Sequence, residues 1–304
     1  NSTWDDMQAG NFSIDSLRHN IYPIWSKCGQ VQPLFTYIKE QYALGSPLII
    51  SGMDCRHALS FSQQNYMATF DSMVLQRCLL SQESKTRFRA MLHLLMAKEY
   101  RLKPKRSDRD FLFAAIDTLK QQLPYLPAFW KQELDNIKQC AANAWASHPL
   151  YTSYRDRQMA SNLYWLYHEK YAGRKIIVWA HNAHTGRNFN DGKRKIYYYN
   201  ETAGNEIHNL LGDTLYTIGF TSLTGTAGRL HTRPYKLAIP KGECFENWIE
   251  SKKLNYAFVN FRNYTGNETF NMQGIMHWEI KANWTKIFDG EFYIRDMYPC
   301  NEVK

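Results

Sequence analysis

A chain of 304 residues is long enough to bury a large core, as one large domain or two smaller ones. Its content of 44% hydrophobic and 21% charged residues is typical of a folded globular protein and excludes a disordered one. No apolar run is long enough to cross a membrane, so we expect no transmembrane segment. The formal net charge of +9 would suit an anionic partner. The most basic stretch, residues 103–110, contains acids and has no nucleic-acid motif, so we expect an ordinary basic surface and no nucleic-acid partner.

The six cysteines form no CxxC pair, which argues against a zinc ribbon or a thioredoxin-like motif. Their wide spacing permits long-range disulfides without requiring them. The sequence does not begin with Met, and its first residues are polar rather than a signal peptide. A mature exported protein and a chain that starts further upstream both fit, and an exported location is slightly favoured over the cytoplasm.

The N-terminal half is mostly helical in pattern. Apolar residues at helical spacing predict helices within residues 12–44, 62–102, 109–123, 129–147 and 151–172, and Gly173 is a C-terminal stop for the last of these. The short apolar run Leu48–Ser51 predicts a buried strand.

The second half alternates strand and helix patterns. The apolar run 175–180 predicts a buried strand, followed by a polar loop over 185–195 and a short helix over 206–211. Further strands are expected at 215–220, 256–261 and 291–295, with a helix over 244–253. This order predicts a single α/β domain over residues 1–304, with a mainly parallel sheet flanked by helices and a large helical insertion at about 62–150.

Two imidazoles and an amide follow the run 175–180 directly, in the order His181, Asn182 and His184. The carboxyl end of a strand in an open α/β sheet is where ligands usually bind, and imidazole exchanges protons near neutral pH. We expect one histidine to accept or donate a proton, the other to hold substrate, and Asn182 to orient an imidazole or an oxyanion. Two solvated loop histidines, or an H-x-x-H metal pair completed by a third ligand, remain alternatives.

Asp54, Arg56 and His57 follow the other apolar run, Leu48–Ser51. Asp54 could orient a histidine, and Arg56 could hold a carboxylate or an anionic transition state. An ordinary salt bridge at the sheet rim is the alternative. Arg155 begins the helix that precedes the histidine segment.

No G-x-S-x-G elbow, P-loop or dinucleotide-binding G-x-G-x-x-G occurs, which argues against a standard α/β-hydrolase, a P-loop NTPase and a dinucleotide-binding domain.

Several segments resemble the erythromycin esterase family, including its relatives described as succinoglycan-biosynthesis proteins. Residues 177–184, Ile-Val-Trp-Ala-His-Asn-Ala-His, are close to the family's most specific signature, and residues 155–163, Arg-Asp-Arg-Gln-Met-Ala-Ser-Asn-Leu, are similar to its RD-x-x-MA-x-N helix. Looser matches occur at 51–54, 211–220 and 288–294.

The resemblance implies an α/β fold with a large helical insertion. It also implies metal-independent hydrolysis of an ester, which is a macrolide lactone in the best-known members, with no cofactor. His181 and His184 correspond to the signature histidines, and Asp54 and Arg155 correspond less closely to family residues. A small-molecule ester or lactone substrate is therefore expected. A catalytically inactive relative that binds a small molecule or a glycan is the alternative.

One part of the family pattern does not occur in this sequence. The family opens with a strand that ends in Gly-Glu-x-x-His-Gly, whose histidine is the expected general base, and residues 1–50 already resemble the segment after it. The resemblance thus predicts that the N-terminal part of the fold lies upstream of residue 1. Loss of the base is the alternative.

Overall fold

The computed structural model describes residues 13–46, 48–57, 65–96, 105–146, 151–189 and 201–303. The chain divides into two compact units. Unit 1 comprises residues 1–27 and 31–162, and unit 2 comprises residues 28–30 and 163–304. No helix in the described ranges is both long enough and apolar enough to span a membrane.

Unit 1 is helical, as the spacing of its apolar residues predicts. Ser13 caps α2 (Ile14–His19), since its Oγ accepts a hydrogen bond from the backbone N–H of Ser16. Pro33 lies in the first turn of α4, where its missing N–H costs nothing. The helices are α2 (Ile14–His19), α3 (Pro23–Ser26), α4 (Gln32–Ala43), α5 (Met67–Met73), α6 (Gln82–Met96), α7 (Arg106–Gln122), α8 (Ala128–Trp145) and α9 (Tyr151–Trp165).

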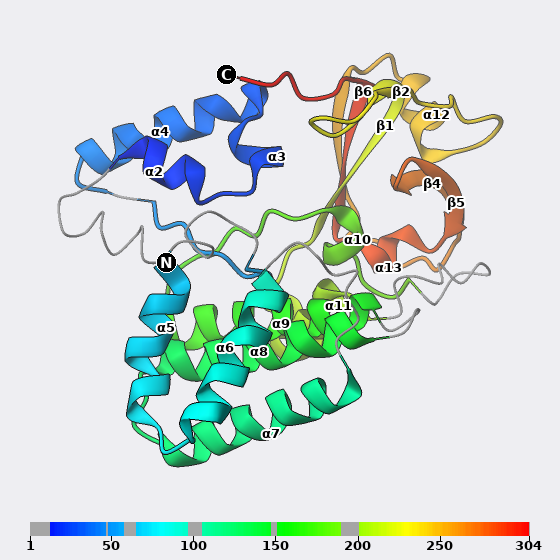
Figure 1. Cartoon of the computed structure of the whole chain (residues 1–304). Coiled ribbons are helices and arrows are strands. Elements are labelled where there is room, and N and C mark those ends of the chain that lie inside the picture. The colour runs from blue at the N-terminus through cyan, green and yellow to red at the C-terminus, as the bar shows by residue number, and fades with distance from the viewer. Residues whose placement is uncertain are drawn as a thin grey trace. The chain divides into compact units, whose positions relative to one another are not determined.

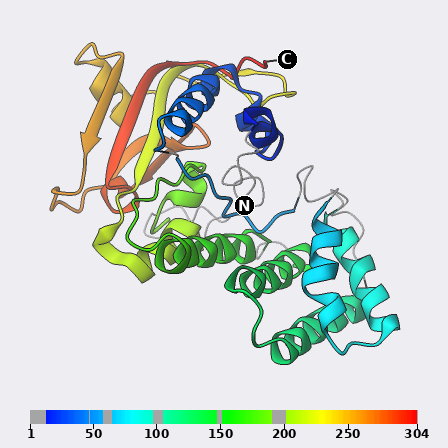
Figure 2. The ribbon, with the colours of Figure 1, turned by 90° about the vertical axis from the view of Figure 1, so that its left-hand side faces the viewer.

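The helical stretch expected over 62–102 is not continuous in its described part. The chain turns after α5 through the short 3-10 helix η3 (Leu75–Arg77), and α6 begins after Ser81. The Ser81 hydroxyl accepts a hydrogen bond from the Ser84 backbone N–H, which stabilises the new start. Helices α6, α7 and α8 then pack against one another around buried residues such as Phe88, Leu112, Ile116 and Leu134 (Figures 1 and 2).

Unit 2 contains a four-stranded sheet in the order β2-β1-β6-β3 (Figure 1). Its strands are β1 (Ile218–Ala227), β2 (Tyr235–Lys236), β3 (Tyr256–Asn260) and β6 (Gly290–Met297). β1 and β6 are parallel, with Phe220 opposite Phe292, whereas β2 and β3 pair antiparallel to their neighbours. The expected strands near 256–261 and 291–295 are confirmed, and the strand expected at 215–220 begins at Ile218 and runs on to Ala227.

The sheet is mixed, so the expectation of a mainly parallel sheet is wrong. The apolar runs 48–51 and 175–180 have no regular secondary structure and join no ladder in the described structure. Ile177 is 96% exposed and Trp179 is 56% exposed. At Phe220 the backbone N–H and C=O on the edge of β1 are bound by the Asn182 side chain, so no strand can pair with β1 at that residue.

Other elements of unit 2 pack against this sheet, among them α10 (Asn182–Thr185), α12 (Phe245–Glu250) and β4 (Phe270–Ile275). An antiparallel hairpin, β4 (Phe270–Ile275) and β5 (Trp278–Ala282), was not predicted from the sequence. The helices are η4 (Leu166–Lys170), α10 (Asn182–Thr185), α11 (Ala203–Leu211), η5 (Gly212–Thr214), α12 (Phe245–Glu250) and α13 (Trp284–Ile287), and α12 confirms the helix expected within 244–253. A disulfide joins Cys28 to Cys300 and ties residues 28–30 to the C-terminal end of the chain.

Candidate functional site

The histidine segment forms the start of the short helix α10 in unit 2. His181 is the N-cap of this helix, and its Nδ1 accepts a hydrogen bond of 3.1 Å from the backbone N–H of Ala183. The backbone N–H of His184 donates to the His181 carbonyl at 2.7 Å. A helix N-cap needs an acceptor, and here the imidazole supplies it. The ring orientation of His181 is therefore fixed by its own helix.

His181 is a neutral imidazole at physiological pH. Burial, followed by the charges of His184, Arg229 and His277, lowers the pKa of His181 to about 4. Because Nδ1 accepts the Ala183 hydrogen bond, the single ring proton of the neutral form is on Nε2. His181 can thus donate a hydrogen bond from Nε2, and it is too weak a base to collect protons near pH 7.

Asn182 fixes α10 to the sheet. Its Nδ2 donates to the carbonyl of Phe220 at 2.8 Å, and its Oδ1 accepts from the Phe220 backbone N–H at 3.3 Å. It also donates to the carbonyl of Gly274 at 2.6 Å. The side-chain amide thus binds both backbone groups of Phe220, which a neighbouring strand would otherwise use. These contacts position the helix that carries His181 and His184.

Two further residues act on His181 and were missed by the sequence analysis. Arg229 and His277 both lower its pKa by their charge, which places them near its ring. His277 lies in the turn between β4 and β5, where Met276 and His277 have φ values of 56° and 57°. Such left-handed backbone is uncommon for residues other than glycine, and it marks positions that the fold constrains strongly. Nothing in the local sequence identifies this turn.

The three histidines do not form a metal-binding set. No group of three or more His, Cys, Asp or Glu side chains within the described ranges has a geometry that could hold a metal ion.

Asp54 and Arg155 form a two-pronged ion pair in unit 1. Arg155 Nη2 donates to Asp54 Oδ2 at 2.7 Å and its Nε donates to Oδ1 at 3.0 Å. Burial opposes ionisation of Asp54, but Arg155 outweighs it and holds the pKa of Asp54 below its ordinary value. The Arg56 backbone N–H also donates to Asp54 Oδ1. All three residues were expected at the site from the sequence, and the structure brings them together.

A buried pair lies beside them in unit 1. His57 Nε2 is 2.7 Å from Glu133 Oε1, and the Tyr66 hydroxyl donates to the same carboxylate oxygen at 2.7 Å. Burial opposes both charges, yet the mutual attraction raises the pKa of His57 and lowers that of Glu133. Glu133 was missed because a glutamate inside an amphipathic helix is typical of an exposed position.

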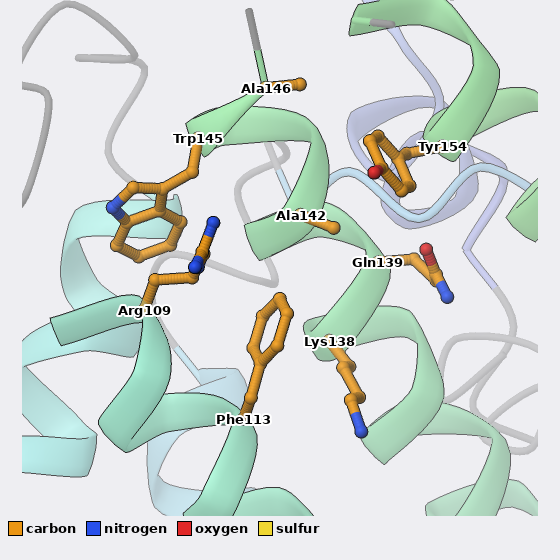
Figure 3. Close-up of a pocket in the computed structure, with 8 residues that line it drawn as sticks. All are labelled: Arg109, Phe113, Lys138, Gln139, Ala142, Trp145, Ala146 and Tyr154. Atoms are coloured by element: carbon orange, nitrogen blue, oxygen red, sulfur yellow. The ribbon is translucent and has the colours of Figure 1, made fainter. Parts of the chain in front are cut away.

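A cavity of about 330 Å3 opens elsewhere in unit 1, beside α7 and α8 (Figure 3). Arg109, Phe113 and Lys138 lie in its wall. Both cations already have acidic partners, since Arg109 pairs with Asp110 at 2.8 Å and Lys138 with Asp117 at 2.5 Å. None of the residues expected at the site lines this cavity.

The expected site residues therefore form two groups. His181, Asn182 and His184 are together in unit 2, whereas Asp54, Arg56 and Arg155 are together in unit 1. The catalytic and binding roles expected for the six residues stay predictions.

Comparison with known proteins gives consistent results. Residues 3–289 match the family model described as erythromycin esterase. "Putative hydrolase YbfO" of Bacillus subtilis (strain 168) is 23% identical over 348 residues, an alignment that covers 100% of this chain and 77% of that protein.

Solved structures share the fold. A succinoglycan biosynthesis protein superposes with a TM-score of 0.77 at 16% identity, over 100% of this chain and 78% of that one. A Bacillus cereus protein gives a TM-score of 0.71 at 16% identity, over 99% and 80% of the two chains. A mutant of the erythromycin esterase EreC in its open conformation gives 0.63 at 12% identity, over 91% and 74%. With a family match over nearly its whole length, this chain belongs to the erythromycin esterase family.

Proposed function

We propose that this protein hydrolyses a carboxylic ester or lactone of a small molecule without a metal ion, and that His181 stabilises the transition state. The observation that carries the proposal is the fixed, neutral imidazole of His181, with Nδ1 held by the Ala183 N–H and the proton on Nε2. Family membership supports the hydrolytic chemistry.

In this reaction a water oxygen attacks the carbonyl carbon, and the carbonyl electron pair moves onto oxygen. The Nε2–H of His181 donates a hydrogen bond to that developing oxyanion. A donor that is already oriented costs no reorganisation during the reaction, and such donors contribute about 100- to 1000-fold in kcat. The tetrahedral intermediate then collapses, the ester C–O bond breaks, and the leaving alkoxide receives a proton.

His184 has the proton-transfer role in this scheme. It lies within the first turn of α10, and its backbone contact with His181 keeps the two residues in a fixed relation. The roles expected for Asp54, Arg56 and Arg155, to orient a histidine and to hold an anionic group, stay predictions. The base that accepts the proton of the attacking water is not assigned.

The test compares two replacements of His181. One keeps the acceptor that caps α10, at the Nδ1 position, and the other keeps the hydrogen-bond donor, at the Nε2 position. In His181→Asn the side-chain oxygen can still cap α10, but no group reaches the Nε2 position. In His181→Gln the amide nitrogen approximates Nε2 and the Nδ1 acceptor is lost. On an ester identified from a panel of p-nitrophenyl esters and macrolide lactones, we expect His181→Asn to lower kcat about 100- to 1000-fold with an unchanged Tm.

His181→Gln should recover part of the lost kcat at a lower Tm. His93→Asn, at an exposed position of α6, is the control for a histidine-to-amide change. Wild-type kcat/KM in His181→Asn, or an absence of hydrolysis of every ester and lactone by the wild-type protein, would contradict the proposal.

A further inference from the structure

The short helix α10 is fixed to the rest of unit 2 at its C-terminal end as well as at Asn182. The Gly186 carbonyl accepts a hydrogen bond of 2.6 Å from the hydroxyl of Thr202, the N-cap of α11. The backbone N–H of Arg187 donates to the Ile287 carbonyl of α13 at 3.2 Å. Forming a single helical turn fixes several backbone angles for few hydrogen bonds, so a helix this short is unstable by itself. Tertiary contacts such as these must therefore hold α10 in place.

The side chain of Arg187 adds a buried ion pair at this end of the helix. Its Nη2 donates to Asp289 Oδ1 at 3.0 Å, and the two side chains are 7% and 9% exposed. Asp289 directly precedes β6, and its Oδ2 accepts a hydrogen bond of 2.7 Å from the backbone N–H of Thr217, which directly precedes β1. Hydrogen bonds between charged groups are stronger than those between neutral groups. Arg187 thus joins the end of α10 to the beginnings of both parallel strands.

A second nitrogen of the Arg187 guanidinium reaches α11. Its Nη1 lies 3.1 Å from His208 Nδ1, and because a guanidinium has no acceptor, His208 accepts this hydrogen bond. Burial, followed by the positive charge of Arg187, lowers the pKa of His208, which keeps its ring neutral and able to accept. One side chain therefore binds two elements in different directions, which the planar guanidinium allows and a single ammonium would not.

We propose that Arg187 is a positioning residue for the site, since it holds the end of α10 against the sheet and α11 and thereby keeps His181 and His184 in place. The consequence for catalysis rests on the proposed function. The effect on the position of His181 does not, and it can be measured without any substrate.

The protonation of His181 reports on the position of α10. Burial, followed by the charges of neighbouring side chains, lowers the pKa of His181 to about 4. If α10 moved away from these surroundings, the pKa of His181 would return toward the ordinary value of 6.5. A loss of global stability alone would not change this pKa in the folded protein.

The test replaces Arg187 by methionine, which keeps much of the side-chain length and removes the charge and the donors. Asp289 then retains the Thr217 N–H and Arg262, whose Nη2 lies 3.3 Å from Oδ2, so we expect the variant to fold. The His181 ring is titrated by NMR with isotope-labelled histidine, and its signals are identified by their absence in His181→Asn. The pKa of His181 should rise by roughly one pH unit or more in Arg187→Met.

A matched control and a second variant make this result decisive. Arg262→Met removes the other guanidinium that pairs with Asp289, and its remaining hydrogen bonds go to the Asp213 and Leu215 carbonyls, so the pKa of His181 should keep its wild-type value. The double variant Arg187→Met/Asp289→Asn leaves neither charge of the pair without its partner and should show the same rise as Arg187→Met. A wild-type pKa of His181 in the double variant, or an equal rise in Arg262→Met, would overturn the proposal.

Kinetics then test the consequence for the site. On the ester identified above, Arg187→Met should lower kcat about 100-fold with KM unchanged within about twofold, because a small misplacement of reacting groups can cost this much. Arg262→Met should keep the wild-type kcat. If the wild-type protein hydrolyses no ester and the pKa of His181 still rises in Arg187→Met, the proposed function fails and the positioning of His181 by Arg187 stands. A raised pKa of His181 with a wild-type kcat would contradict a role of Arg187 in catalysis.

Discussion

Replacement of Glu291 by glutamine should stabilise this protein at neutral pH. Glu291 lies on β6 with 0% exposure, and neither of its carboxylate oxygens has a hydrogen-bond partner in the described structure. Burial raises its pKa well above the ordinary value of 4.5, and the charge of the buried Glu246 raises it further. Glutamine has the shape of the protonated acid and cannot ionise, so it retains the packing and removes the buried charge.

The pH dependence follows from the direction of that shift. Below pH 4.5 the side chain is protonated in both the folded and the unfolded chain, and the substitution changes little. Above pH 4.5 the unfolded chain releases the proton first, so the stability of the wild-type protein falls by about 1.4 kcal/mol per pH unit until the folded pKa is reached. Above that pKa the loss is constant. In a unit of this size the loss corresponds to roughly 3–5 °C in Tm for each pH unit.

Thermal melts of wild type and Glu291→Gln between pH 4 and pH 8 measure this directly. The two Tm values should coincide near pH 4 and diverge in favour of the variant as the pH rises. Glu243→Gln makes the same chemical change at an exposed position and controls for net charge. A Tm difference that does not vary with pH, or a variant less stable than wild type at pH 8, would refute the buried and unpaired state of Glu291.

Two further substitutions test specific contacts. Gly204→Ala would normally favour a helix by up to about 1 kcal/mol, but a Cβ at this position would lie 1.8 Å from the Thr185 carbonyl oxygen. Urea unfolding should therefore show a free energy of unfolding lower by roughly 2–3 kcal/mol. An unchanged midpoint would show that α10 and α11 are not in contact here. Arg155→Lys keeps the charge but cannot donate two parallel hydrogen bonds to the partly exposed Asp54. The same assay should show a free energy of unfolding lower by about 1 kcal/mol. Wild-type stability in this variant would mean that the second hydrogen bond contributes nothing.

The helices were predicted well from the sequence because residues at or next to their ends determine where they begin and stop. Ser13 and Pro33 mark the starts of helices by their own chemistry, and Gly173, with φ 77°, is the last residue of the turn that follows η4. Strands depend on a partner that the local sequence does not name. The run 175–180 is as apolar as a buried strand, but it joins no sheet in the described structure.

The candidate site also contains residues that neighbouring sequence predicts and residues that only tertiary contacts identify. His181, Asn182 and His184 were predicted because neighbouring residues build their arrangement. Glu133 and His277 were not predicted, because each lies far in sequence from the histidine it affects. Glu133 reaches His57, and His277 reaches His181, only in the folded chain. The sequence around Glu133 in α8, and around His277 in its turn, does not mark either residue as part of a site. Only the three-dimensional contacts identify them.

The short sequence His-Asn-Ala-His gives each of its polar residues a separate structural task. The His181 ring caps the helix that it begins, and this contact decides which ring nitrogen carries the proton. Asn182 uses its whole amide to fix that helix to the backbone of Phe220. A change at Asn182 would therefore move both histidines together, whereas a change at His181 would alter the cap and the donor at once. For this reason loss of activity in His181→Ala would not by itself establish catalysis, and the paired Asn and Gln replacements, which remove one function each, are needed to separate chemistry from helix capping.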